Sequence, residues 1–129
     1  MYLDADVLYA YLKPTDWLKN YALKVIKHPN LITSSITILE LEIISKRDFD
    51  LEFSTNVLSK VKLLSNLKIV EFNEQIQEKA VELRKKHQIN IFDSIHAATT
   101  ILKNEIIISS DLAFDSIKEL KRKDPRTFI

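Results

Sequence analysis

Short apolar runs alternate with longer amphipathic segments along the chain. The apolar runs are typical of buried strands, and they lie at residues 2–3, 31–33, 67–70 and 106–108. Apolar residues spaced three or four positions apart predict helices at about 18–26, 36–46, 51–65, 74–87 and 92–102, with a last helical segment at 112–123. Strands that alternate with helices favour a short parallel sheet covered by helices on both faces. We therefore predict an α/β fold, formed by a single domain over residues 1–129.

Polar residues stand where these predicted helices begin and end. Thr15 or Asp16 precedes the helix at 18–26 and fits the N-cap position. The chain has no glycine, so asparagine is expected to supply the left-handed residue that ends many helices. The four asparagines that follow helical stretches are Asn30, Asn66, Asn90 and Asn104.

The composition excludes several classes of protein. A hydrophobic share of 46% excludes a disordered chain, and no apolar run approaches the roughly 18 residues that span a membrane. Asp4 and Asp6 interrupt the apolar N-terminus, which therefore lacks the pattern of a signal peptide. Without cysteine there is no disulfide, thiolate nucleophile or Cys-ligated zinc site, and without glycine there is no Gly-rich phosphate loop. We expect a soluble, cytoplasmic protein that does not associate with membranes.

The net charge is only +1, but basic residues gather in two segments. Residues 79–88 hold four basic residues against one acidic residue, and residues 117–126 hold five against two, so each carries a local charge of +3. Such segments would suit a polyanionic partner. Ordinary solvated helix faces are the simpler explanation of the charges taken alone.

Four acidic residues from separate segments stand where burial would be costly. Asp4 directly follows the first strand, and Asp111 follows the last apolar strand. Glu40 lies in the middle of a helix among apolar neighbours, and Asp93 lies at the start of an Ala-rich helix. Ligands of open parallel sheets bind beyond the carboxyl ends of the strands. We therefore expect the four carboxylates to meet at one edge of the sheet.

The chemistry of such a cluster points to a divalent cation. Neighbouring residues supply no obvious Lys or Arg to neutralise four acids, and an unpaired buried carboxylate is expensive. Mg²⁺ and Mn²⁺ prefer carboxylate and water oxygens, activate water, and stabilise the charge of a phosphodiester transition state. The cluster therefore predicts a hydrolytic nuclease. As an alternative, Asp93 and Asp111 are helix caps and Asp4 starts a turn, but capping does not explain Glu40.

Two further side chains lie close to these acids in the sequence. His96 follows Asp93 by three residues on the same helical face, and we expect it to be packed or to face the substrate rather than to bind metal. Ser110 precedes Asp111, where a hydroxyl would hold a water or a carboxylate. A simple turn residue is an equal alternative for Ser110.

Four stretches of the chain resemble the PIN-domain nucleases, and among them the small VapC-type toxins of toxin–antitoxin pairs. They are YLDADVLYAYL at 2–12, SSITILELEII at 34–44, INIFDSIHAATT at 89–100 and IIISSDLAFDSI at 106–117. They follow the family's order and spacing over nearly the whole chain. By this resemblance the family's acids fall on Asp4, Glu40, Asp93 and Asp111, with Ser109 or Ser110 as the preceding hydroxyl and Asp115 as an acidic position beyond.

The resemblance implies a PIN-like fold and a Mg²⁺- or Mn²⁺-dependent endoribonuclease. Asp4, Asp93 and Asp111 would hold one or two ions, and Glu40 would complete the site. Water would attack the phosphorus without a covalent intermediate and leave 5′-phosphate and 3′-hydroxyl ends. The basic residues expected to contact the RNA are Lys85, Lys86 and Arg122. A toxin of this type is a homodimer that a small VapB-type antitoxin neutralises.

The chain departs from the family at Ala5-Asp6, where relatives often have Thr-Asn. Asp6 either adds an acid to the site or caps the following helix. The Asp4 and Asp6 pair also resembles the start of haloacid dehalogenase-like phosphatases, with Asp4 as nucleophile and Asp6 as acid and base. That alternative lacks the usual glycine and leaves Glu40 and Asp93 unexplained. A third alternative is a catalytically silent PIN-like module that binds RNA or a protein.

Overall fold

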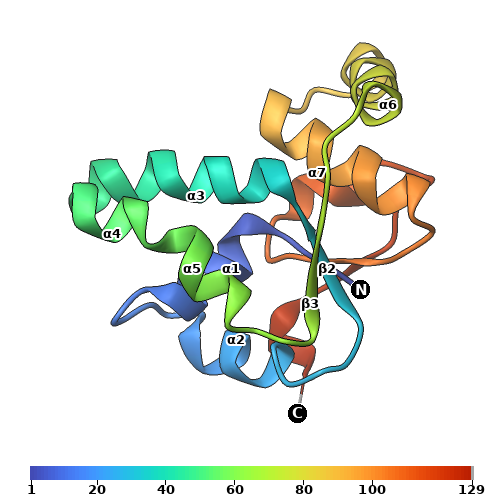
Figure 1. Ribbon diagram of the computed structural model, residues 1–129. Coiled ribbons are helices and arrows are strands. Elements are labelled where there is room, and N and C mark those ends of the chain that lie inside the picture. The colour runs from blue at the N-terminus through green and yellow to red at the C-terminus, as the bar shows by residue number, and fades with distance from the viewer. Residues whose placement is uncertain (129) are drawn as a thin grey trace.

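The computed structural model describes residues 1–128. At its centre is a five-stranded sheet in which every neighbouring pair is parallel (Figure 1). The strands, in the spatial order β3-β2-β1-β4-β5, are β3 (Leu67–Val70), β2 (Leu31–Ser34), β1 (Tyr2–Leu3), β4 (Ile107–Ile108) and β5 (Arg122–Lys123). The predicted α/β class with a parallel sheet is confirmed. Because β1 is the central strand, Asp4 leaves the sheet at its middle.

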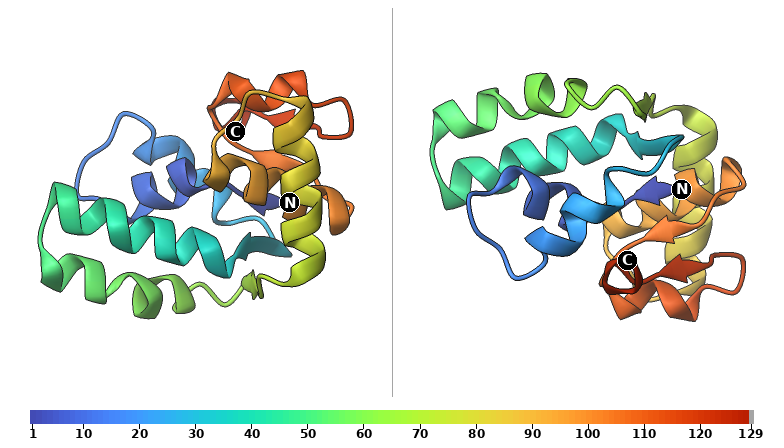
Figure 2. Two further views of the ribbon diagram at one scale, coloured as in Figure 1. Left: turned by 90° about the horizontal axis from the view of Figure 1, so that it is seen from above. Right: turned by 90° about the horizontal axis from the view of Figure 1, so that it is seen from below.

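Helices connect successive strands and surround the sheet. Within residues 1–128 they are α1 (Ala5–Leu12), α2 (Lys19–Val25), α3 (Ser35–Asp48), α4 (Leu51–Thr55), α5 (Val57–Lys62), α6 (Glu74–Lys86), α7 (Ile91–Leu102) and the 3₁₀ helices η1 (Leu112–Ser116) and η2 (Pro125–Thr127). Helices α3, α4 and α5 form an arm that extends away from the sheet (Figures 1 and 2). None of the helices in the described residues has the length and apolar character needed to cross a membrane.

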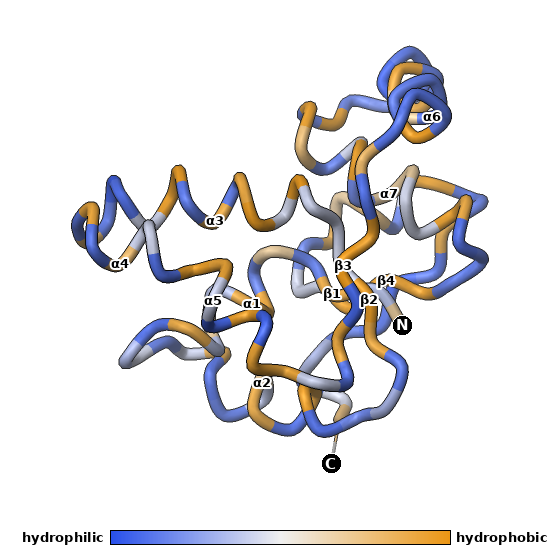
Figure 3. The backbone as a smooth tube through the Cα atoms, in the orientation of Figure 1, coloured by the Kyte–Doolittle hydropathy of each residue, from blue (hydrophilic) through white to orange (hydrophobic). Residues whose placement is uncertain are grey.

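The sheet is buried on both faces, and β1 shows how. Successive strand residues point to opposite faces, so the side chains of Tyr2 and Leu3 enter different halves of the core. Leu3 packs with apolar residues of α1, α2 and α5, including Leu8. Tyr2 packs with residues of α6, α7 and η1, including Phe114. Figure 3 shows the apolar strands at the centre and the largely hydrophilic α6 at the periphery.

Two helix predictions differ from the structure, and one helix was not predicted. The segment 112–123 is not one helix, because η1 ends at Ser116 and the chain returns to the sheet, where Arg122 pairs with Ile107. The segment 51–65 is divided at Asn56 into α4 and α5. Helix α1 was not predicted, since its eight residues are almost all apolar or aromatic and show no clear helical stripe.

The asparagines take two different roles. Asn30 and Asn104 have φ angles of 60° and 55° and are the left-handed residues that were expected. The prediction is wrong for the other two. The Asn66 amide donates hydrogen bonds to two carbonyl groups just beyond α2, and Asn90 is the N-cap of α7. The N-cap of α2 is Leu18, without a side-chain cap, so the prediction of Thr15 or Asp16 at that position is wrong. Asp16 instead accepts a hydrogen bond from the Leu18 backbone N–H.

Candidate active site

The four predicted acids line one pocket of about 520 Å³ at the carboxyl ends of β1 and β4, and Asp6 joins them. The side chains come from α1 and its N-cap residue Asp4, from α3 and α7, and from the loop after β4. The residues that line the pocket are Asp4, Ala5, Asp6, Tyr9, Glu40, Ile44, Arg47, Asp48, Asp93, Ser110 and Asp111. The expected convergence of separate segments at one sheet edge is what the structure shows.

Asp4 is held at the end of β1 by backbone and side-chain donors. Its Oδ1 accepts from the Ala5 backbone N–H at 2.8 Å, so Asp4 is the N-cap of α1. Its Oδ2 accepts from the Ser109 hydroxyl at 2.6 Å. Burial raises the pKa of Asp4, and the nearby His96 and the Ser109 hydroxyl offset only part of that effect.

Asp6 belongs to the pocket and is not the cap of α1. Its Oδ2 accepts from both the backbone N–H and the hydroxyl of Ser110. Its Oδ1 is buried without a hydrogen-bond partner among the described residues. Burial, together with the charge of Asp4, raises the pKa of Asp6 to about 7. The two hydroxyls of the β4 loop are thus divided: Ser109 serves Asp4, and Ser110 serves Asp6.

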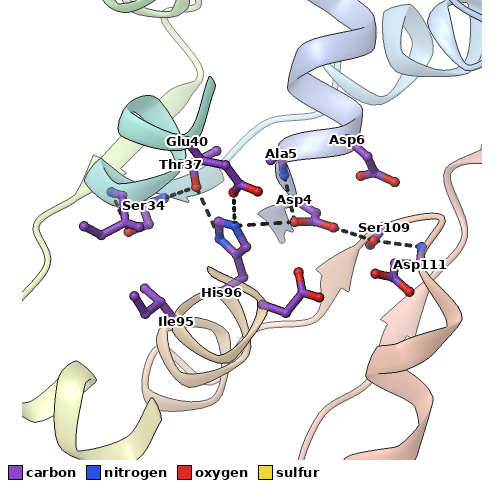
Figure 4. A network of polar contacts seen from close by, with 12 residues as sticks. Asp4, Ala5, Asp6, Ser34, Thr37, Glu40, Ile95, His96, Ser109 and Asp111 are labelled. Atoms are coloured by element: carbon purple, nitrogen blue, oxygen red, sulfur yellow. Dashed lines mark hydrogen bonds and ion pairs between the residues drawn. The ribbon is translucent and has the colours of Figure 1, made fainter. Parts of the chain in front are cut away.

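Glu40 has a buried partner that the sequence did not reveal. His96 of α7 is fully buried, and its Nε2 lies 2.6 Å from Glu40 Oε1 and 3.7 Å from Asp4 Oδ1 (Figure 4). Its Nδ1 lies 2.6 Å from the Tyr2 hydroxyl. The expectation that His96 is packed is therefore confirmed, and both ring nitrogens are occupied. Two acids that line the pocket, Asp4 and Glu40, therefore both contact the imidazole ring of His96.

A chain of buried hydroxyl groups lies behind His96. The Thr33 hydroxyl reaches both the Leu3 carbonyl and the Thr37 hydroxyl at 2.9 Å, but the carbonyl only accepts, so it takes the single Thr33 proton. The Thr37 hydroxyl also lies 3.1 Å from the Tyr2 hydroxyl, where either group can donate. The Tyr2 oxygen in turn lies 2.6 Å from His96 Nδ1 and can accept a proton from it.

The contacts of His96 favour a buried cation. A doubly protonated ring donates from Nδ1 to the Tyr2 oxygen and from Nε2 to the Glu40 carboxylate. Burial alone would lower the pKa of His96, but its contacts with Tyr2, Glu40 and Asp4 outweigh burial and raise the pKa well above 6.5. One of the acids is thereby neutralised without Lys or Arg.

Asp93 and Asp111 complete the acidic lining. Asn90, rather than Asp93, caps α7, and the Asn90 amide contacts Asp93 Oδ2 at 3.1 Å. Burial and the charge of Asp111 raise the pKa of Asp93 to about 6. Asp111 does cap η1 through the Ala113 backbone N–H, so the capping alternative holds for this acid while its side chain also lines the pocket.

The remaining predicted residues lie outside the pocket. Asp115 is bound by both Nε and Nη2 of Arg122, and Arg122 Nη1 donates to the Ser109 carbonyl at 2.9 Å. This pair therefore fixes the loop that carries Ser109. Lys85 is exposed near the end of α6, and Lys86 forms an ion pair with Glu82 on that helix. Neither of these lysines lines the pocket.

Three pocket residues with polar side chains were missed: Tyr9, Arg47 and Asp48. Their only signal in the sequence was their spacing on helices that also carry acids: Arg47 and Asp48 lie seven and eight residues after Glu40, on the same helix face.

The carboxylates fit a divalent cation chemically. No group of three or more His, Asp and Glu side chains in residues 1–128 could hold a metal ion as it stands, so binding requires the carboxylates to turn towards the ion. Burial first, and neighbouring carboxylates second, raise the pKa values of Asp4, Asp6 and Asp93, so the ionised acids lack sufficient compensation. Asp6 Oδ1 is also a buried acceptor without a donor. A hard cation would satisfy both.

Comparison with known families identifies the fold. The PIN domain family model matches residues 1–120. The chain belongs to the PIN domain family. This match confirms the resemblance seen in the sequence. It also decides against the haloacid dehalogenase alternative, which explained neither Glu40 nor Asp93. No curated protein matches the chain significantly.

Solved structures of a toxin and of toxin–antitoxin complexes share the fold at low sequence identity. A toxin–antitoxin complex from Klebsiella pneumoniae is 20% identical with a TM-score of 0.73, over 96% of each chain. VapBC-1 from nontypeable Haemophilus influenzae is 23% identical with a TM-score of 0.72, over 98% of each chain. VapC20 of Mycobacterium tuberculosis, a sarcin–ricin loop cleaving toxin, is 14% identical with a TM-score of 0.76, over 92% of this chain and 97% of that one.

Proposed function

We propose that this PIN domain is a metal-dependent endoribonuclease that hydrolyses RNA phosphodiester bonds. The observation that carries the proposal is the pocket itself, where acids from four separate segments meet at the carboxyl edge of the sheet. Carboxylates with raised pKa values in one cleft are typical of a functional site. A purely structural role would not gather so much unneutralised charge.

The residues divide into those that would hold the cation and those that orient them. Asp4, Asp93 and Asp111 would hold Mg²⁺ or Mn²⁺, directly or through water, and Glu40 would complete the site. When bound, such an ion lowers the pKa of water and offsets the charge that develops on the phosphate.

The side chains behind the carboxylates fix their positions. The Ser109 hydroxyl holds Asp4, and the Ser110 hydroxyl and N–H hold Asp6. His96 holds Glu40 by the 2.6 Å contact of Nε2 with Oε1, which leaves Glu40 Oε2 as the oxygen without this contact. Because neither ring nitrogen is free, His96 is not a general base for RNA cleavage. The reaction thus depends on carboxylates and water.

The biological role we propose is that of a VapC-type toxin. The support is that the similar solved structures include toxin–antitoxin complexes. A VapB-type antitoxin would then be the protein partner, and the chain would act as a homodimer in the cytoplasm with RNA as its substrate. Lys85 and Lys86 would contact the RNA from α6. Arg122, held by Asp115, would act through the loop that carries Ser109.

The proposal is tested by cleavage of an end-labelled structured RNA in Mg²⁺ or Mn²⁺. The wild type is expected to cut, EDTA to stop the cutting, and Asp93→Asn to abolish it. Glu78→Gln is the matched control, because this exposed carboxylate of α6 lies outside the pocket. Cleavage that survives EDTA or Asp93→Asn would contradict the proposal. RNA binding without any cleavage would instead support the catalytically silent module.

A further inference from the structure

The acidic pocket continues beyond the carboxylates, along α3. Glu40, Ile44, Arg47 and Asp48 all line it, and they lie on successive turns of one helix face. Seven residues separate Glu40 from Arg47, which corresponds to about 10 Å along the helix axis. One end of the pocket is therefore acidic, and the other end carries Arg47 together with Tyr9 of α1.

Arg47 is held in place at this second end. Its Nε donates to Asp48 Oδ1 at 2.9 Å, and the Tyr9 hydroxyl donates to Asp48 Oδ2 at 2.8 Å. Both Asp48 oxygens are thus occupied, and Asp48 orients the guanidinium against α1. The Arg47 side chain remains 73% exposed. Within residues 1–128 its only hydrogen bond uses Nε, so its two terminal nitrogens have no protein acceptor there, and the residue lines the pocket.

The position of Arg47 in the last turn of α3 has a simpler explanation, and the neighbouring Lys46 helps to assess it. Lys46 and Arg47 both lie in the last turn of α3, where cations interact favourably with the helix dipole. Lys46 has this position and an exposed side chain but does not line the pocket. The dipole accounts for both residues, but it does not account for the Tyr9–Asp48 pair that orients Arg47. Lys46 is therefore the matched control for any role of Arg47 in the pocket.

We propose that Arg47 forms a second phosphate-binding site in the pocket, which holds an RNA phosphate one or two nucleotides from the cleaved bond. This inference rests on the proposed function, since it takes the acidic end as the place of cleavage. A guanidinium matches phosphate geometry with two parallel hydrogen bonds. The separation of about two helix turns places Arg47 beyond the reach of the cleaved phosphate and within reach of a neighbouring one. Among the residues lining the pocket, it is the one cation.

The kinetic test compares single substitutions on RNA cleavage. Arg47→Ala is expected to raise KM about tenfold, as loss of a charged hydrogen bond does, and to leave kcat within about twofold because the residue touches no reacting atom. Arg47→Lys should reverse part of the rise in KM, since lysine keeps the positive charge but cannot donate two parallel hydrogen bonds to a phosphate. Lys46→Ala should leave KM unchanged. Equal effects of Arg47→Ala and Lys46→Ala would overturn the proposal.

A double-mutant cycle, which combines Arg47→Ala with a modified phosphate in the RNA, tests the contact between Arg47 and that phosphate. A methylphosphonate removes the charge of a single phosphate, and it is placed in turn at each of the two nucleotides on either side of the cut. At one position it should raise KM about tenfold in the wild type and have no further effect in Arg47→Ala. If the methylphosphonate and Arg47→Ala effects are additive at every position, Arg47 binds none of these phosphates.

Binding measured without cleavage separates this inference from the proposed function. The Asp93→Asn protein is titrated with fluorescent RNA in Mg²⁺ over a series of KCl concentrations. Adding Arg47→Ala should reduce the slope of log K against log salt by about 0.7, the value for one phosphate contact on a single strand, whereas adding Lys46→Ala should not. An unchanged slope overturns the second phosphate site. Absence of cleavage by the wild type overturns the proposed function instead.

Discussion

Replacing Asp6 by Asn should stabilise the protein at alkaline pH in the absence of divalent metal. Asp6 Oδ1 is buried without a donor, and Asp6 Oδ2 is bound by Ser110. Asn is nearly isosteric and keeps an oxygen for the Ser110 donors. It removes the charge that burial and Asp4 make unfavourable. The native residue thus lowers stability of the metal-free state, as functional residues often do.

The size and the pH dependence follow from the pKa of Asp6. Raising the pKa from 3.8 to about 7 corresponds to a ceiling of about 4 kcal/mol at pH 8, at roughly 1.4 kcal/mol per pH unit. Because Asp6 shares its interaction with Asp4 and relaxation reduces the cost, we expect about half, or roughly 2 kcal/mol. Between pH 3.8 and about 7 the folded protein keeps a proton that the unfolded chain has released. The free energy of unfolding of the wild type therefore falls as pH rises through this range.

The assay is urea and thermal unfolding in EDTA at pH 5 and pH 8. Asp6→Asn should raise the midpoint temperature by roughly 8 °C at pH 8 and by much less at pH 5, where wild-type Asp6 is already protonated. Asp16→Asn is a control of opposite sign. Burial raises the pKa of Asp16, but hydrogen bonds from Lys13 and the Leu18 N–H outweigh burial and bring this pKa below its ordinary value. Asp16→Asn should therefore destabilise the protein at pH 8. An Asp6→Asn effect that is equal at both pH values would refute the reasoning.

Two further predictions concern the supports of the site and its metal. His96→Gln should lower the kcat for RNA cleavage by about tenfold with little change in KM, because Glu40 loses the donor that orients it; a kcat equal to that of the wild type would show that Glu40 is positioned without it. Mn²⁺ should raise the unfolding midpoint of the wild type, and by more at pH 8 than at pH 5, because protons compete for Asp6 and Asp93, whose pKa values are about 7 and about 6. Calorimetric unfolding with and without Mn²⁺ measures this, and a stabilisation independent of pH would contradict it.

Much of the fold follows from local patterns of residues. The apolar runs at 31–33 and 67–70 are long enough to mark strands, and the stripe of α6 marks a helix. The two-residue strand β5 has no such signal, because Arg122 and Lys123 are polar and join the sheet only through pairing with β4. Its register depends on contacts that no local pattern encodes.

In the site, too, some roles were predictable from the local sequence, whereas others depend on residues far away in the chain. Asp4 and Asp111 were predictable because Asp4 directly follows β1 and Asp111 comes three residues after the end of β4. Glu40 was predictable because a carboxylate in an apolar helix needs a partner. That partner was not predictable, since His96 is 56 residues away and its role depends on the protons of Tyr2 and the threonines behind it. The role of Asn90 as cap, which leaves Asp93 to line the pocket, likewise required the structure.

The most direct test of the central claim is the chemistry of the RNA ends that the wild type produces in Mg²⁺. Hydrolysis by water at the carboxylate site predicts 5′-phosphate and 3′-hydroxyl ends, which ligation and phosphatase sensitivity distinguish. Attack by the ribose 2′-hydroxyl would instead leave 2′,3′-cyclic phosphate and 5′-hydroxyl ends, and it needs a base that His96, with both nitrogens occupied, does not supply. We predict 5′-phosphates that disappear with Asp93→Asn. Cyclic phosphate ends from the wild type would contradict the account.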